Sequence, residues 1–205
     1  MKSDNPQVFV VDDEAPLVHA IGMLLDAHRM PHRGFTSPRT FLRTIKSGHP
    51  GCILLDVRMP EMSGLEVQDA LRRRGCRQPV IFLTGHGDIP MAVRATRAGA
   101  LDFLEKPARR SLLMARIRAA LKQDRKQRER MSDLSRNARN IATLTPRERQ
   151  VLELLAQGLS SQKMAKKLRL SPRTVEMHRL RMMRRLGVKN TAQAVRMILE
   201  AGGEA

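Results

Sequence analysis

The stretch "ILLDVRMPEMSG", residues 53–64, decides the fold of the N-terminal part of this chain. Its apolar residues belong to a buried strand expected over 52–56, and a helical pattern follows over 64–73. Asp56 stands at the end of that strand, in a chain whose net charge is +18. A carboxylate in this place needs a partner or a ligand, because the burial of an unpaired charge is costly.

Further apolar runs alternate with helical patterns through the N-terminal half. Strands are also expected at 8–13 ("VFVVDD"), near 32–36, at 79–84 ("PVIFLT") and at 101–105 ("LDFLE"). Helices are expected at 16–29, 64–73 and 90–98. Because strands that alternate with helices pair in parallel, the pattern predicts an α/β domain with a doubly wound, parallel, five-stranded sheet.

Charged and polar residues gather at the carboxyl ends of these strands. They are Asp12, Asp13, Asp56, Thr84 and, just after the last strand, Lys106. The carboxyl ends of parallel strands open on one rim of the sheet, so these side chains are expected to converge. Crowded carboxylates repel one another, and a hard cation with oxygen ligands relieves that cost, which predicts bound Mg²⁺.

This arrangement predicts a nucleophile. An exposed oxygen of Asp56 can attack a phosphoryl group and form an acyl phosphate, while Lys106 neutralises charge and Thr84 donates a hydrogen bond. The alternative is that Asp12 and Asp13 only cap the helix that follows and that Asp56 and Thr84 are ordinary strand-end residues. The convergence of all these residues on one rim favours the nucleophile.

Residues 8 to about 122 resemble the receiver domain of bacterial two-component response regulators. The resemblance is carried by the DD pair at 12–13 and by "LLDVRMPEMSG", "LTGHGD" and "FLEKP". It implies that Asp56 is the phosphoacceptor. It also implies that Asp13 and Asp56 bind Mg²⁺ directly, that Asp12 acts mainly through water, and that Arg58 contributes its backbone carbonyl.

The same resemblance implies a conformational switch and a cis Lys106–Pro107 bond. Phosphate on Asp56 would draw Thr84 inward, and Phe103 would turn into the vacated space. The alternative for Phe103 is an ordinary core phenylalanine, because a strand aromatic buries well in any case.

The C-terminal part differs in charge and in pattern. Residues 1–122 carry 19 Lys and Arg against 12 Asp and Glu, whereas residues 123–205 carry 19 against 8. A long polar helix starts near Arg109, and Thr145 and Glu148 then form the capping box of a further helix. Helices at 161–168, 172–186 and 191–201 complete the expectation of an all-α four-helix domain.

The helix expected at 172–186 has the form of a DNA-recognition helix. Val175, Met182 and Leu186 are expected to face the core, which leaves a basic outer surface. The residues expected to contact DNA are Arg173, Thr174, Glu176, Met177, His178, Arg179, Leu180, Arg181 and Arg184. The alternative is a solvated basic face on a dimerisation bundle.

Residues 144–200 resemble the LuxR/GerE-type helix-turn-helix domain. The resemblance is carried by "LTPRERQVLELLAQGLS", "SPRTVEMHR" and "RRLGV", although Ser161 and Lys163 stand where relatives often have Asn and Glu. The combination of these motifs with "TGHGDIPMAV" resembles the FixJ-like regulators. The expected domains are the receiver (1–122), a helical linker (123–143) and the helix-turn-helix domain (144–205).

The resemblance implies a transcriptional regulator controlled by phosphorylation. Its implied partners are a histidine kinase, double-stranded DNA, RNA polymerase and a second copy of the chain in a homodimer formed on phosphorylation. No apolar run reaches the roughly 20 residues that span a bilayer, and no signal-peptide pattern is present, so a cytoplasmic protein without membrane contact is expected.

Two other classes of function are the alternatives to a transcriptional regulator. A Mg²⁺-dependent phosphatase with Asp56 as nucleophile would need a second acid two residues later, where this chain has Arg58. An enzyme is therefore not expected. A pure interaction protein, whose basic domain holds RNA or protein, would lack salt-dependent and sequence-specific binding to duplex DNA.

Overall fold

The structure of the protein is a computed structural model, which describes residues 5–85 and 99–202. The chain divides into two compact units, Met1–Gln127 and Arg128–Ala205. Each unit has a hydrophobic core of its own. The helix expected at 90–98 lies outside the described residues.

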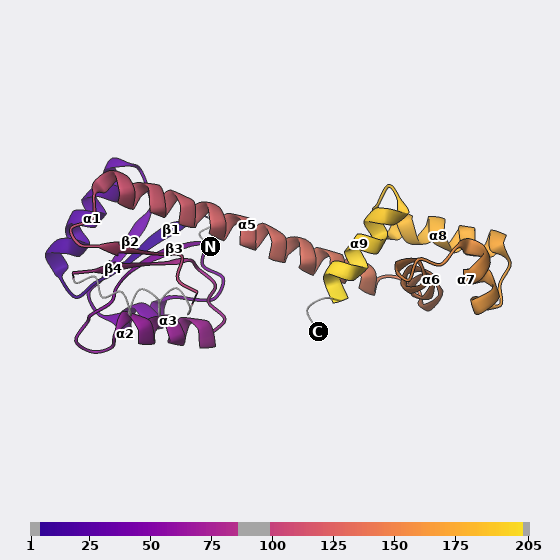
Figure 1. Cartoon of the computed structure of the whole chain (residues 1–205), viewed down its shortest axis with the longest axis horizontal. Coiled ribbons are helices and arrows are strands. Elements are labelled where there is room, and N and C mark those ends of the chain that lie inside the picture. Colours follow the sequence, from indigo (N-terminus) through magenta and orange to yellow (C-terminus); the bar gives the residue numbers. More distant parts are fainter. Residues whose placement is uncertain (1–4, 86–98, 203–205) are drawn as a thin grey trace. The chain divides into compact units, whose positions relative to one another are not determined.

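The first unit is built on a five-stranded sheet in the order β2-β1-β3-β4-β5, and all neighbouring strands are parallel (Figure 1). The strands are β1 (Gln7–Val11), β2 (His32–Phe35), β3 (Gly51–Asp56), β4 (Val80–Thr84) and β5 (Asp102–Glu105). The predicted doubly wound, parallel sheet is therefore confirmed.

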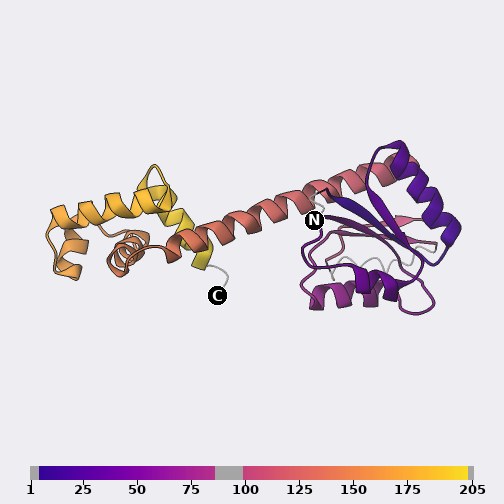
Figure 2. The same ribbon diagram turned by 180° about the vertical axis from the view of Figure 1, so that it is seen from behind.

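Helices cover both faces of this sheet. They are α1 (Ala15–Ala27), α2 (Pro38–Thr44), α3 (Gly64–Arg73) and α5 (Arg110–Ala142). Figure 1 and the reverse view in Figure 2 place α1 and the start of α5 on one side of the sheet, and α2 and α3 on the other. The strands are thus enclosed between two layers of helices, which explains their nearly continuous apolar sequences.

Side chains that alternate along each strand fill the two hydrophobic cores, one on each face of the sheet. In β1, Val8 and Val10 belong to the core under α1 and α5, whereas Phe9 and Val11 belong to the core under α2 and α3. Successive side chains of a strand point to opposite faces, so one short strand supplies both layers. The polar residues at the strand ends are left at the rim.

Helix α2 was not predicted from the sequence. It is short, and its start is marked by Ser37, whose hydroxyl accepts a hydrogen bond from the Thr40 amide at 3.4 Å, and by Pro38 in the first turn. A serine followed by a proline is a helix-start signal, but seven residues give too little periodicity to show a helix.

Helix α5 is one continuous helix of 33 residues. Its first turns pack on the sheet through Leu113, Met114 and Ile117, whereas Leu112 is 41% exposed. Farther along, the buried carboxylate of Asp124 accepts a hydrogen bond from the Gly51 amide at 3.0 Å. Among the described residues, no helix is long and apolar enough to cross a membrane.

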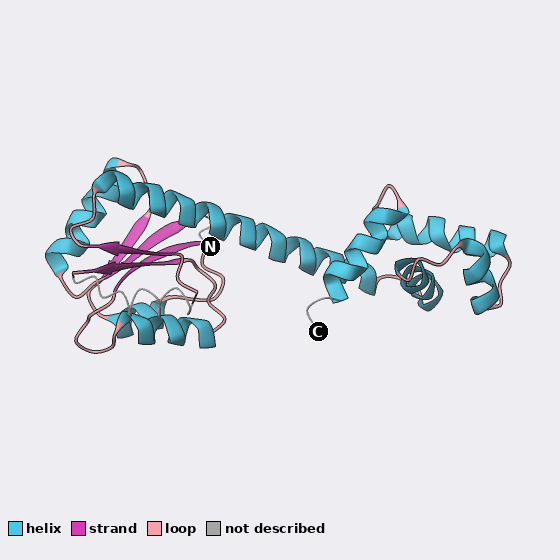
Figure 3. Ribbon diagram, in the orientation of Figure 1, coloured by secondary structure: helices cyan, strands magenta, loops and turns pink. Residues whose placement is uncertain are grey.

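The second unit contains the end of α5 and four short helices among its described residues (Figure 3). They are α6 (Pro146–Ala156), α7 (Ser161–Leu168), α8 (Pro172–Leu186) and α9 (Thr191–Gly202). Val175, Met182 and Leu186 face the core as predicted. Ser171 caps the start of α8, and Gly187 in the left-handed conformation caps its end.

The predicted capping box of α6 joins a buried acid to the start of the helix. The Glu148 carboxylate accepts a hydrogen bond from the Thr145 amide at 2.9 Å, and Arg185 Nε lies 3.4 Å from Glu148 Oε1. Burial alone would raise the pKa of Glu148, but the hydrogen bonds from Thr145 and the charges of Arg185 and His178 lower it overall. The ionised carboxylate is therefore stabilised by the fold.

We predict that Glu148→Gln destabilises the second unit by about 0.3–1 kcal/mol at neutral pH, because the glutamine oxygen can still accept from the Thr145 amide but the negative charge beside Arg185 and the helix N-terminus is lost. Because the folded pKa lies below the ordinary value of 4.5, this contribution is present above pH 4.5 and is lost as the pH falls through the folded pKa. Hydrogen exchange of residues 146–156 in the full chain, measured by mass spectrometry at several pH values, checks both parts. Glu153→Gln, an exposed change in the same helix, is the control.

Candidate functional site

The register of the sheet brings together three carboxylates from two strands. Val11 of β1 pairs with Leu55 of β3, so Asp12 and Asp56 leave their strands at the same level. One carboxylate oxygen from each of Asp12, Asp13 and Asp56 lies within 4.8 Å of the others. Asp12 and Asp56 are buried, whereas Asp13 is exposed to solvent at this edge of the sheet.

Lys106 is the cation of this cluster. Its backbone amide donates to the Thr84 carbonyl at 2.6 Å, which holds it at the end of β4, and its peptide bond to Pro107 is cis. The ammonium Nζ lies 2.6 Å from Asp12 Oδ2 and 2.9 Å from Asp56 Oδ1.

Glu14 was not among the site residues expected from the sequence. Its Oε1 lies 3.3 Å from Lys106 Nζ, at the exposed edge of the cluster. The signal that could have indicated it is its position directly after the acidic pair at 12–13.

Burial and charge pairing act in opposite directions on the pKa values of Asp56 and Lys106. Burial raises the pKa of Asp56, and the hydrogen bond and charge of Lys106 offset only part of that rise. Burial would lower the pKa of Lys106, but its bonds to Asp12 and Asp56 outweigh burial and raise it. Lys106 therefore stays charged, and the Asp56 carboxylate gains from any further positive charge placed beside it.

The loop after β3 closes tightly around Asp56. The Arg58 amide donates a hydrogen bond to Asp56 Oδ2 at 3.0 Å, and a shallow pocket of about 470 Å³ lined by Asp13, Val57 and Arg58 opens beside it. At Gly64 a Cβ atom would lie only 2.2 Å from the Asp56 carbonyl oxygen. A residue without a side chain is required there, because the first turn of α3 contacts the backbone of the strand end.

Thr84 and Phe103 occupy neighbouring strands. Thr84 is buried and ends β4, while Phe103 lies in β5 and is only partly buried. The Phe103 ring lies 6.3 Å from the Phe82 ring, centroid to centroid. Phe103 thus packs at the margin of the core rather than inside it.

In the second unit, α8 presents most of the residues expected to contact DNA. Those exposed are Arg173, Glu176, Met177, Leu180, Arg181 and Arg184, and those partly buried are Thr174, His178 and Arg179. Met177 and Leu180 are exposed by 40% and 61%, high values for apolar side chains. The outer face of α8 is therefore basic and partly apolar, as a surface for the major groove requires.

Comparison with known families identifies both units. Residues 8–118 match the family described as "Response regulator receiver domain", and residues 142–198 match "Bacterial regulatory proteins, luxR family". The chain belongs to the response regulator family. This response regulator is 40% identical over 190 residues to the response regulator protein TodT of Pseudomonas putida, covering 93% of this chain and 84% of TodT.

Another relative of this response regulator is the transcriptional regulatory protein FixJ of Azorhizobium caulinodans. It is 40% identical over 195 residues, which cover 95% of this chain and 92% of that protein. Among solved structures, the response regulator StyR matches with a TM-score of 0.83 and 36% identity, over 96% of this chain and 99% of StyR. Full-length FixJ from B. japonicum matches with a TM-score of 0.59 and 34% identity, over 98% of each chain.

These matches establish the general function of this response regulator. A receiver domain is joined in one chain to a LuxR-type domain, and relatives that match along most of its length are transcriptional regulators. The protein is thus a transcription regulator controlled by phosphorylation.

We predict that Gly64→Ala destabilises the first unit by about 1–3 kcal/mol, the range for overpacking a tight contact, because its methyl group would strike the Asp56 carbonyl. Urea unfolding followed by circular dichroism measures the loss, since the chain has no Trp or Tyr for fluorescence. Gly48→Ala is the matched control, because a Cβ atom there has nothing within 4 Å. Equal unfolding midpoints for the two variants would contradict the proposed close approach.

Proposed function

We propose that Asp56 receives a phosphoryl group from a histidine kinase and that the C-terminal unit then binds promoter DNA. The observation that carries this proposal is the position of Lys106 Nζ, 2.6 Å from Asp12 Oδ2 and 2.9 Å from Asp56 Oδ1. A buried carboxylate beside a second carboxylate and a fixed cation is suited to attack on a phosphoryl group.

In the chemical step a phosphoryl group passes from the imidazole of the kinase histidine to the carboxylate of Asp56. A carboxylate oxygen of Asp56 forms a bond to phosphorus while the bond from phosphorus to the imidazole nitrogen of the kinase histidine breaks. The imidazole leaves with the bonding electron pair, and Asp56 becomes an acyl phosphate. Lys106 stays charged and stabilises the negative oxygens of the transferring group, and Thr84 donates a hydrogen bond to one of them.

The residues at the rim fit a Mg²⁺ ion. One carboxylate oxygen from each of Asp12, Asp13 and Asp56 lies within 4.8 Å of the others, and carboxylate oxygens are ligands that this ion takes. In the proposed site Asp13 and Asp56 would hold the ion directly, Asp12 would act through water, and Arg58 would supply its backbone carbonyl. When bound, Mg²⁺ supplies the positive charge that a phosphoryl group needs beside these carboxylates.

The proposed signal passes through Thr84 and Phe103. A phosphoryl group on Asp56 attracts the Thr84 hydroxyl, and the partly buried Phe103 ring turns toward the space that this leaves. The surface around β5 then changes, and the chain forms a homodimer. The marginal packing of Phe103 supports this step, because a fully enclosed ring has no room to turn.

We propose that α8 then binds duplex DNA through its exposed basic residues. RNA polymerase is the further partner at the promoter. Arg173, Arg181 and Arg184 contact phosphates or base edges, and Met177 and Leu180 contact apolar groups in the major groove. In this proposal residues 1–122 form the receiver, 123–143 the helical linker and 144–205 the DNA-binding domain.

We predict that Asp56→Asn abolishes labelling of the protein by a small radioactive phosphodonor in the presence of Mg²⁺, because the amide is not a nucleophile. Asp69→Asn, which removes a half-exposed carboxylate of α3 paired with Arg72, is the control and should be labelled like the wild type. Acid-stable or acid-labile label on the Asp56→Asn protein would refute the assignment of Asp56.

We predict that Arg184→Gln weakens binding to every duplex about equally and lowers the slope of log affinity against log salt by about one, as the loss of one phosphate contact does. Fluorescence anisotropy of labelled duplexes between low and high salt measures both quantities. Arg39→Gln, the same charge change in α2, should leave the slope as it is in the wild type. An unchanged slope for Arg184→Gln would remove this residue from the phosphate contacts.

A further inference from the structure

Glu176 is the single acidic residue of α8, and it lies on the exposed face of a basic helix. Its side chain is 51% exposed. A carboxylate directed toward DNA is repelled by the phosphates, so its place on this face is unfavourable unless it contacts a donor there. The structure shows how the charge is held.

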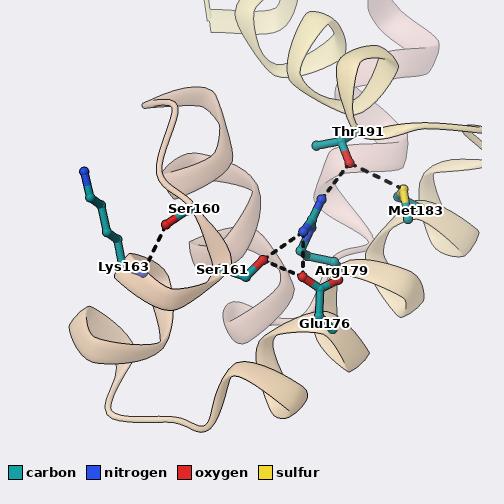
Figure 4. A network of polar contacts seen from close by, with 7 residues as sticks. All are labelled: Ser160, Ser161, Lys163, Glu176, Arg179, Met183 and Thr191. Atoms are coloured by element: carbon teal, nitrogen blue, oxygen red, sulfur yellow. Dashed lines mark hydrogen bonds and ion pairs between the residues drawn. The ribbon is translucent and has the colours of Figure 1, made fainter.

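Glu176 belongs to a network of polar contacts that joins three helices (Figure 4). Glu176 Oε1 accepts hydrogen bonds from Ser161 Oγ at 2.5 Å and from an Arg179 guanidinium nitrogen at 2.7 Å. The same nitrogen of Arg179 lies 2.8 Å from Ser161 Oγ, and its other terminal nitrogen donates to Thr191 Oγ1 at 3.1 Å. Arg179 thus ties α8 to the starts of α7 and α9.

The role of Arg179 in this network differs from the contact expected from the sequence. Its side chain is 24% exposed, and both terminal nitrogens of its guanidinium donate to neighbouring side chains. The hydrogen bond from Ser161 lowers the pKa of Glu176, burial opposes this, and Arg179 lowers it further. Glu176 therefore stays ionised in a fixed orientation.

One oxygen of the carboxylate is left for a ligand. All the hydrogen bonds of Glu176 to described residues use Oε1, and Oε2 makes none with them. Ser161, which donates one of these hydrogen bonds, stands at a position where this chain departs from the LuxR-type pattern. An oriented acceptor on the exposed face of α8 is suited to one kind of base edge.

We propose that Glu176 reads a cytosine, with Oε2 accepting a hydrogen bond from the exocyclic N4 amino group in the major groove. Guanine and thymine present acceptors there, and adenine presents its N7 acceptor beside its N6 amino group, so only cytosine offers a donor without a repelling neighbour. Arg179 is a positioning residue that acts through Glu176. This inference rests on the proposed binding of duplex DNA by α8.

The test is selection from randomised duplex DNA with the full chain, treated with Mg²⁺ and a small phosphodonor. Wild type is compared with Glu176→Gln, Ser161→Ala and Arg179→Met. In Glu176→Gln, the preference for cytosine at one position of each half-site should fall by about tenfold. The preference for adenine at that position should rise, because glutamine pairs with N6 and N7 of adenine. Ser161→Ala and Arg179→Met should broaden preference at that same position and leave the other positions unchanged.

The matched control is Glu200→Gln, which removes a carboxylate from another ion pair between Glu and Arg, that of Arg196 in α9. It should leave the selected motif as in the wild type. Circular dichroism of each variant checks folding, and Ser161→Ala keeps the test valid if Arg179→Met does not fold.

Two results would overturn the inference while the proposed DNA binding stands. One is a wild-type motif that Glu176→Gln selects without change. The other is an equal loss of preference at every position in Glu176→Gln, which is the mark of a structural role alone. A wild-type chain that selects no motif would instead refute the proposed DNA binding and the inference with it.

Discussion

One ammonium group, that of Lys106, is shared by two buried carboxylates at the carboxyl edge of the sheet. Asp12 and Asp56 would repel each other without it, because both lie in a poorly solvated place. The cluster exists because β1 and β3 are parallel neighbours and end at the same level. The fold thus concentrates negative charge at a position that a cation and a phosphoryl group can share.

The second unit uses a fixed cation in a similar way. Arg179 binds the carboxylate of Glu176 and ties α8 to the starts of α7 and α9. In both units an amino or guanidinium group orients a carboxylate that remains available to a ligand. The difference lies in solvation, since Asp56 is buried whereas Glu176 is half-exposed, so Asp56 is suited to chemistry and Glu176 to recognition.

Much of the fold could be predicted from local patterns. The five strands, the helix at 64–73, the Thr145 capping box and the inward face of α8 follow from periodicity and from caps that act within a few residues. Helix α2 was missed because seven residues are too few to show a period. The continuity of α5 over 33 residues could not be predicted, because its polar second half gives no pattern that distinguishes a helix from a break.

The sequence by itself determined which residue types stand at the strand ends, and from these the acidic cluster with Lys106 could be predicted. Only the tertiary structure decided that Glu14 joins this cluster, that Asp124 caps the Gly51 amide, and that Arg179 turns inward. The physical reason is distance along the chain. Strand periodicity and helix caps depend on neighbours in sequence, whereas the partner of a long charged side chain depends on which elements pack beside it.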